Sequence, residues 1–345
     1  MRKSVIALMI AACLVIGISA SLCVRATAEK KAIKIGFAPS VYELTDYFGQ
    51  AAIAIQQSLT DAGIPFEFIA RAAEHEADVA SQINIVEDMV TLGVDYIVVG
   101  PIDYWGIVPA IKRANKAGIP VIVINYINPH PPECGIDALA YCGYSHATGG
   151  RITGEWVADN LLKPGDEVAM MLGEPGNKAS DERGLTAARI WEDRGMKIVY
   201  THYGYWEATQ AYDGTERILM GYPNVKLIYG VNSAMAMGVA NAVHSAGLTG
   251  KVHVIGFGCV TSELDMIWEG LITAAIFRDA QSSGRDMADA IMRHLRGEPV
   301  PKQYELDMVM IHTQEDVLKC IPVEQLKFME NWPEIEKDLK ARKKL

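Results

Sequence analysis

The sequence predicts an α/β protein built from two doubly wound parallel-sheet lobes. Short apolar runs alternate with longer segments of helical periodicity from residue 32 to about residue 295, which is typical of parallel sheets covered by helices. Most of these runs lack polar–apolar alternation, as expected for strands buried on both faces. The chain has 345 residues, more than one compact core usually holds, so we expect two domains.

Nine apolar runs have the length and composition of buried strands. They are residues 33–37, 66–70, 96–99, 121–124, 168–172, 198–203, 227–229, 252–257 and 273–277. Eight intervening segments show helical periodicity. They are residues 47–61, 78–92, 107–116, 148–162, 180–194, 210–220, 234–245 and 284–295. Gly63, Gly118 and Gly247 follow three of these segments, as helix stops do. Residues 333–345 are expected to form a solvated helix.

The first 28 residues have the three parts of a secretory signal peptide. Arg2 and Lys3 precede an uncharged stretch over residues 4–24, and Ala26-Thr27-Ala28 supplies a small-residue cleavage site. A retained membrane anchor is the main alternative, because the apolar stretch approaches spanning length. A lipoprotein site at Cys13 fits less well, since the apolar run continues far beyond it. We therefore predict export to the periplasm.

Composition and cysteine content describe an acidic protein of an oxidising compartment. Cleavage removes three basic residues and no acid, so 29 Lys and Arg remain against 42 Asp and Glu, a formal charge of −13. This balance excludes a basic nucleic-acid surface. A Gly-containing loop separates Cys134 from Cys142, and we expect these two to form a disulfide. The pairing of Cys259 and Cys320 stays open.

Polar and aromatic residues follow several of the predicted strands. In open parallel sheets, ligands bind outside the carboxyl ends of the strands, so these positions are the candidate site. They are residues 43–48, 125–126, 181–183, 232–233, 257–258 and Arg278. Two arginines, amides, hydroxyls and aromatic rings are thereby brought together. This is the chemistry expected for a polar, ring-shaped ligand.

Five short motifs, in their order and spacing, resemble one protein family. They are residues 45–48 (Thr-Asp-Tyr-Phe), 180–184, 232–238, 262–265 and 297–301. Over nearly the whole mature length, the chain resembles the type I periplasmic binding proteins. Within them it is most similar to the LuxP-type autoinducer-2-binding proteins and related sugar-binding proteins. The resemblance implies a monomer that closes two lobes over a ligand at a hinge.

The resemblance also implies lobe boundaries. Three crossover segments are expected near Tyr144, Arg278 and Tyr304. The N-terminal lobe would then comprise residues 29–144 and 279–304, and the C-terminal lobe residues 145–278 and 305–322. Residues 323–345 would form a C-terminal tail.

Nine positions carry over from the family as ligand-binding residues. They are Glu43, Thr45, Phe48, Asn125, Arg183, Asn232, Ser233, Phe257 and Arg278. The two arginines match those that face the borate diester in autoinducer-2 receptors, and the two phenylalanines match aromatic walls. Glu43 stands where those receptors have a glutamine. Because a carboxylate there would repel an anion, the sequence favours a neutral sugar or polyol.

The sequence thus predicts an exported binding protein without enzymatic activity. It would capture a small cyclic sugar or polyol for a sugar-type ABC importer in the membrane. The alternative is an autoinducer-2 receptor that signals through a membrane sensor kinase. No cofactor, metal site, catalytic residue or nucleic-acid partner is expected: Glu74-His75-Glu76 lacks metal-ligand spacing, and Cys259 has no evident histidine partner.

Expression of the full chain with its leader should yield a secreted protein that begins at Glu29, because Ala28 ends the cleavage site. N-terminal sequencing and intact mass of the periplasmic fraction measure this. A membrane-bound product that keeps residues 1–28 would contradict the prediction and support the anchor.

Overall fold

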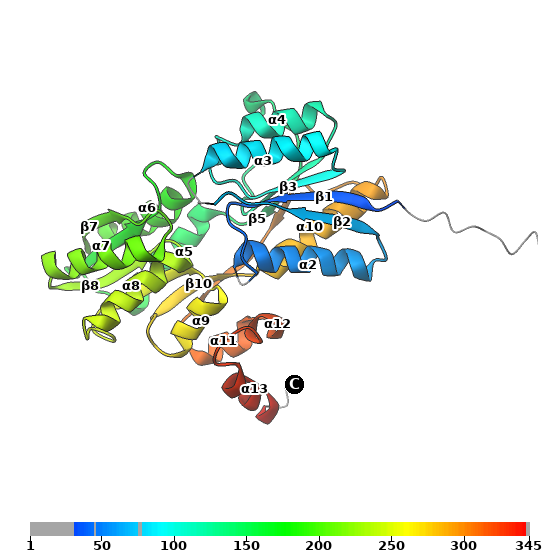
Figure 1. Cartoon of the computed structure of the whole chain (residues 1–345). Coiled ribbons are helices and arrows are strands. Elements are labelled where there is room, and N and C mark those ends of the chain that lie inside the picture. The colour runs from blue at the N-terminus through cyan, green and yellow to red at the C-terminus, as the bar shows by residue number, and fades with distance from the viewer. Residues whose placement is uncertain (1–30, 45, 75–77, 343–345) are drawn as a thin grey trace, which may run out of the picture. The chain divides into compact units, whose positions relative to one another are not determined.

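The predicted two-lobed α/β fold is confirmed by a computed structural model, which describes residues 31–44, 46–74 and 78–342. The proposed signal peptide and Thr45 lie outside the described residues. Two six-stranded sheets form the two lobes (Figure 1). Within the described ranges, no helix is both long and apolar enough to cross a bilayer.

The first sheet has the strand order β11-β5-β4-β3-β1-β2, and all its neighbouring strands are parallel. Its strands are β1 Ile33–Ala38, β2 Phe66–Ala70, β3 Tyr96–Val99, β4 Val121–Ile124, β5 Ala138–Gly143 and β11 Gln303–Glu305. Helices α2 (Tyr47–Asp61) and α10 (Ala280–Leu295) cover one face, and α3 (Val79–Leu92) and α4 (Val108–Lys116) cover the other (Figure 1). Both faces are therefore buried, which explains the continuous apolar runs.

The second sheet has the order β12-β10-β9-β8-β6-β7. Its strands are β6 Glu167–Leu172, β7 Lys197–Tyr203, β8 Val225–Gly230, β9 His253–Gly258, β10 Ala274–Arg278 and β12 Met308–Ile311. Its helices are α5 His146–Asn160, α6 Lys178–Asp193, α7 Ala208–Gly221, α8 Ser233–Ser245 and α9 Thr261–Trp268. Leu172 packs against Gly184 of α6, whereas the neighbouring Met171 points toward Gly204 and the α8 side. Alternate residues of β6 thus meet helices on opposite faces.

The sequence missed three strands. β5, β11 and β12 are short or contain little β-branched sequence, so local pattern does not identify them. β11 and β12 lie at sheet edges, and β12 pairs antiparallel with β10 in an otherwise parallel sheet. The chain passes between the sheets three times, after β5, after β10 and after β11.

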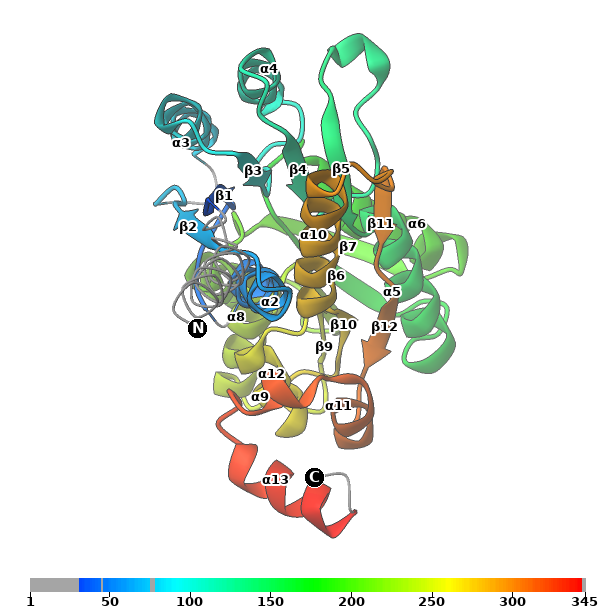
Figure 2. The ribbon, with the colours of Figure 1, turned by 90° about the vertical axis from the view of Figure 1, so that its right-hand side faces the viewer.

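The C-terminal segment is more firmly attached than the sequence suggested. After β12 it forms α11 (Gln314–Cys320), α12 (Val323–Leu326) and α13 (Trp332–Ala341), with α11 beside α9 (Figure 2). Ile335 and Leu339 of α13 are 0% and 1% exposed and belong to the apolar core. The prediction of a merely solvated helix is therefore wrong, because one face of α13 is buried.

The predicted disulfide is also wrong, since Cys134 and Cys142 are both free thiols. Cys142 belongs to the core on the α2–α10 side of the first sheet, and the preceding Tyr141 belongs to the core on the α3–α4 side. Cys134 ends the short helix Pro132–Cys134, which lies beside Lys112 of α4. The two thiols thus lie toward opposite faces of the sheet.

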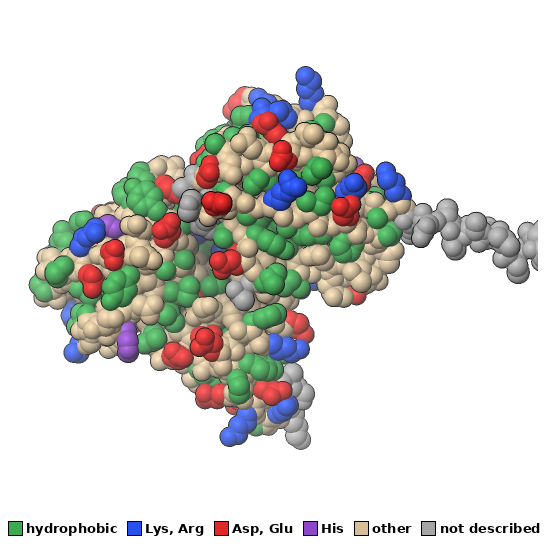
Figure 3. Space-filling model, viewed as in Figure 1, with side chains coloured by type: hydrophobic (Ala, Val, Ile, Leu, Met, Phe, Trp, Pro, Cys, Tyr) green, Lys and Arg blue, Asp and Glu red, His purple; other side chains and the backbone are tan. Residues whose placement is uncertain are grey.

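Surface charge is mixed on the face shown in Figure 3. Lys and Arg side chains there are interspersed with Asp and Glu. Exposed ion pairs of the described residues include Arg151 with Glu155 and Lys34 with Glu67. Pairs of this kind contribute at most about 1 kcal/mol each, so the buried cores hold the fold together.

Replacing Ile335 by alanine should destabilise the protein by about 2 kcal/mol or more, because it removes a fully buried side chain. Urea denaturation monitored by circular dichroism measures the change. Lys337→Ala, on the exposed side of the same helix, is the control and should stay within about 0.5 kcal/mol of the wild type. Equal stability of the two variants would contradict the packing of α13.

Candidate ligand-binding site

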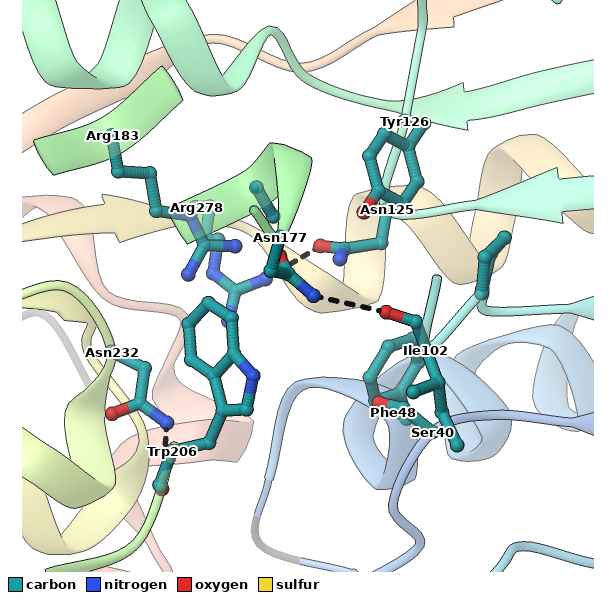
Figure 4. A pocket seen from close by; sticks show the side chains of 12 residues that line it. Ser40, Phe48, Ile102, Asn125, Tyr126, Asn177, Arg183, Trp206, Asn232 and Arg278 are labelled. Carbon is teal, nitrogen blue, oxygen red and sulfur yellow. Dashed lines mark hydrogen bonds between the residues drawn. The ribbon is translucent and has the colours of Figure 1, made fainter. Parts of the chain in front are cut away.

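A cavity of about 80 Å³ lies at the carboxyl ends of the strands, between the two sheets (Figure 4). This inner cavity is lined by segments that follow β1, β3, β4, β6, β7 and β8, by the last residue of β10 and by α2. The lining residues are Ser40, Phe48, Pro101, Ile102, Asn125, Tyr126, Asn177, Ala179, Arg183, Trp206, Asn232 and Arg278. Both lobes therefore contribute to one site, as the strand-end rule predicts.

The hydroxyl of Tyr144 organises the base of this cavity. It donates a hydrogen bond to Oδ1 of Asn125 at 2.6 Å. It accepts hydrogen bonds from Nη2 of Arg183 at 3.0 Å and from Nη1 of Arg278 at 2.5 Å. Nη1 of Arg278 also donates to Oδ1 of Asn125 at 2.9 Å. One proton and two lone pairs are all that a phenol offers, so this oxygen is fully used.

Arg183 belongs to α6 and is only 4% exposed, and hydrogen bonds hold its guanidinium in place. Its Nη1 donates to the carbonyl of Val231 at 2.8 Å, and its Nε donates to Nδ1 of His146 at 3.1 Å. Burial, with the positive charges of Arg183 and Arg278 adding, holds the pKa of His146 well below its usual range. The imidazole is therefore neutral, and its Nδ1 can accept the hydrogen bond from Nε of Arg183.

Arg278 ends β10 and is 9% exposed. Its guanidinium carbon lies 4.1 Å from the centroid of the Tyr47 ring, a cation–π contact. The hydroxyl of Tyr47 in turn forms a hydrogen bond of 2.6 Å with Ser283 of α10. Stacking and hydrogen bonds together fix the plane of this guanidinium, and no described residue accepts a hydrogen bond from its Nη2.

Trp206 forms an aromatic wall of the inner cavity (Figure 4). Its indole N–H donates to Glu174, and its carbonyl accepts from Nδ2 of Asn232 at 3.1 Å. The ring lies over Gly173, where any Cβ would stand 2.4 Å from the indole. Trp206 has φ +67°, an uncommon conformation for a bulky residue, so the surrounding contacts hold it in place.

A second, outer compartment of about 310 Å³ adjoins the inner cavity and shares Phe48, Trp206, Asn232 and Arg278 with it. Its other lining residues are Val41, Glu43, Asp46, Tyr47, Ser233, Ala234, Met237, Val260 and Ser262. Its lining mixes carboxyl and hydroxyl groups with apolar side chains such as Val41, Met237 and Val260.

Two carboxyl groups near the outer compartment have perturbed protonation. Glu263 accepts hydrogen bonds from Ser233 at 2.5 Å and from the backbone N–H of Cys259 at 2.6 Å, yet burial raises its pKa to about 7. Asp46 caps α2 by accepting from the N–H of Gly49 at 2.6 Å. Burial raises its pKa to about 6, with the charge of Glu43 contributing.

The structure distributes the sequence-predicted residues over three places. Five line the inner cavity: Phe48, Asn125, Arg183, Asn232 and Arg278. Glu43 and Ser233 line the outer compartment, and Thr45 lies outside the described residues. Phe257 is fully buried behind Arg183, with its ring centroid 4.3 Å from the guanidinium carbon.

Sequence reasoning missed Tyr144 as a site residue and did not include Ser40, Ile102 or Asn177. Tyr144 follows β5, a strand that the sequence pattern did not reveal. Had that strand been recognised, the strand-end rule would have selected Tyr144. Asn177 is the N-cap of α6, a local role that accounts for an asparagine at this position. Its second contact, to the carbonyl of Ile102, is evident only in the structure.

Comparison with known proteins gives consistent matches. The model of a family described as periplasmic binding protein domain matches residues 35–299. The D-ribose/D-allose-binding protein of Pseudomonas aeruginosa is 32% identical over 210 residues, which cover 61% of this chain and 66% of that protein, just under two thirds. The ribose import binding protein RbsB of Bacillus subtilis is 29% identical over 226 residues, covering 65% of this chain and 71% of that protein.

Among solved structures, an ABC transporter periplasmic solute binding protein from Actinobacillus succinogenes with bound D-allose is similar over 81% of this chain and 97% of that chain. The TM-score is 0.72 at 27% sequence identity.

Ionisation of Glu263 should destabilise the folded protein. Its pKa rises from 4.5 to about 7 on folding, so the folded state binds this proton more tightly than the unfolded state. The resulting stabilisation, about 3 kcal/mol, is complete below pH 4.5 and is lost as the pH rises through about 7.

Urea denaturation of the wild type and of Glu263→Gln between pH 4.5 and pH 8 measures this effect. The stability of the wild type relative to the variant should fall across that range. Glu216→Gln, at an exposed position, is the control and should give a flat difference. A flat difference for Glu263→Gln as well would contradict the assignment.

Proposed function

Because this chain belongs to the periplasmic binding protein domain family, we propose that it captures a small cyclic sugar or polyol and delivers it to a sugar-type ABC importer. The observation that carries the proposal is the inner cavity between two lobes, with two arginines, three asparagines and three aromatic rings in its lining. Relatives named for ribose and allose binding support this class of ligand.

The lining matches the chemistry of a sugar. Hydroxyl groups both donate and accept, so the planar groups of Arg183, Arg278 and Asn125 can each hold more than one of them. The apolar face of a sugar ring packs well on flat aromatic surface, which Phe48 and Trp206 supply. These rings bring contact area at low conformational cost.

Closure of the lobes is the expected conformational change. Nδ2 of Asn177, before α6 of the second lobe, donates to the carbonyl of Ile102, after β3 of the first lobe, at 3.3 Å (Figure 4). Such a bond between lobes can form only when they approach each other. Closure excludes water and strengthens the polar contacts around the ligand, and it presents a distinct surface to a membrane partner. The protein binds and releases its ligand without converting it.

The autoinducer-2 receptor is a second hypothesis, favoured by the two arginines at the cavity. It differs in ligand and in partner, which would be a sensor kinase. The relatives reported above carry sugar-binding names, so import of a sugar or polyol remains the proposed function.

A pentose, hexose or polyol should raise the melting temperature of the mature protein. At about 100 times its dissociation constant, a ligand adds about 2.7 kcal/mol of stability. A thermal-shift screen measures this, with autoinducer-2 tested with and without borate. Arg183→Met should abolish the shift, whereas Arg189→Met, an exposed arginine on the same helix, should preserve it.

A shift with autoinducer-2 and borate alone would replace the importer proposal with the receptor. Conversion of the bound sugar to a product would contradict both, because each describes binding without chemistry.

A further inference from the structure

We infer that the ligand of the inner cavity is a small polyhydroxylated anion, such as a sugar carboxylate, whose negative charge lies between Arg183 and Arg278. The inference rests on the proposed function and specifies its ligand class. It departs from the neutral ligand that the sequence favoured.

The first observation is that all acceptors of the two guanidinium groups are uncharged. Arg183 donates to the carbonyl of Val231, the imidazole of His146 and the hydroxyl of Tyr144. Arg278 donates to the same hydroxyl and to the amide of Asn125. No ion pair among the described residues includes either arginine.

The second observation is the unused donor capacity of Arg278. A guanidinium carries five N–H groups. The Nε of Arg278 is buried without a hydrogen-bond partner, and no described residue accepts from its Nη2. Buried donors are satisfied in nearly all folded proteins, so an arginine in the cavity lining with unsatisfied N–H groups has capacity for a further acceptor.

The third observation is the proximity of two buried positive charges. Nη2 of Arg183 and Nη1 of Arg278 contact one oxygen, at 3.0 and 2.5 Å. Like charges at such close range repel strongly where water is largely excluded, and each also loses hydration on burial. A negative group between them removes the repulsion and supplies acceptors for the free N–H groups. A neutral sugar supplies only the acceptors.

The nearby carboxyl groups do not take this role. Asp46 accepts from the backbone N–H groups of Gly49 and Glu43, and Glu263 accepts from Ser233 and the N–H of Cys259. Burial raises the pKa of both acids, to about 6 and about 7. The charge of Arg278 lowers the pKa of both acids in part, but neither forms an ion pair with it, and Oε1 of Glu263 has no hydrogen-bond partner.

Glu43 does not oppose an anion at this position. Its side chain is exposed and lines the outer compartment, whereas Arg183 lines only the inner cavity. The sequence suggested that this carboxylate faces the ligand, whereas in the structure it shares the outer compartment with Arg278 and does not line the inner cavity. Because Glu43 is exposed, solvent screens its repulsion of an anion in the inner cavity.

Isothermal titration calorimetry with matched ligand pairs tests the inference. The pairs are D-glucuronate with D-glucose, D-galacturonate with D-galactose and D-gluconate with D-glucitol, all in borate-free buffer. A hydrogen bond between charged groups is stronger than one to a neutral group by a factor of about 10 to 100 in affinity. In the pairs that bind, the anion should be favoured by about this factor.

Variants of Arg278 assign the preference to this site. Arg278→Met should reduce the ratio of anion to neutral affinity at least tenfold, and Arg278→Lys, which keeps the charge, should preserve most of it. Arg189→Met removes the same charge from the protein surface and should leave the ratio unchanged. Loss of the preference in Arg189→Met as well would overturn the assignment to the cavity.

The outcomes separate this inference from the function on which it rests. Equal or tighter binding of the neutral member in every pair that binds would overturn the anionic ligand and leave sugar binding intact. Binding of D-ribose or D-allose only when borate is added would support an anion, formed as a borate ester instead of a carboxylate. Failure of all these ligands to bind would overturn both the inference and the proposed function.

Discussion

The shared hydroxyl of Tyr144 is the constraint on which the rest of the site depends. It joins Asn125, which follows β4, to Arg183 of α6 and Arg278 of β10. Residues from both lobes thus meet at one oxygen that has no hydrogen-bonding capacity left. The directions of both guanidinium groups follow from this arrangement, and so does the position of the cavity above them. A residue without a hydroxyl at this point would leave two buried charges without a common partner.

Strained backbone is concentrated around the same region. Asn125, Tyr205, Trp206 and Cys259 have positive φ values, from 51° to 76°. Asn125 and Trp206 line the inner cavity. The carbonyl of Cys259 accepts a hydrogen bond from the side-chain amide of Gln325, and its N–H donates to Glu263. Uncommon conformations persist where the surroundings determine them, and they cluster at functional sites. The two apolar cores supply the stability that allows this strain, because the inner strands of both sheets are buried, whereas the edge strands β2, β7, β11 and β12 are partly exposed.

The sequence predicted the fold well where the signal is local. The strands at residues 66–70, 96–99 and 121–124 and the helix at 47–61 have the observed bounds, since composition and periodicity act within each segment. The edge strands β11 and β12 are too short for such a signal, and they are defined by pairing with the non-adjacent segments β5 and β10. The predicted disulfide is wrong for a similar reason, because the face of β5 that carries Cys142 is set by the folded sheet.

For the site, too, the sequence predicted what local pattern determines and missed what tertiary structure determines. The strand-end rule selected the arginines and Asn125, but it cannot tell a residue in the lining from one behind it. Phe257 lies behind Arg183, and Trp206 forms the aromatic wall in the second lobe. The sequence also could not show that Glu43 turns toward the outer compartment. That orientation bears on the ligand charge inferred above, and it depends on tertiary structure.

A crystal structure of the complex with a ligand that binds in solution tests the central claim most directly. Our account predicts that the molecule occupies the inner cavity, with one of its oxygens within hydrogen-bonding distance of both Arg183 and Arg278, and that Tyr144 keeps its bonds to both arginines. A ligand bound beside Glu43 in the outer compartment, without contact to either arginine, would contradict it.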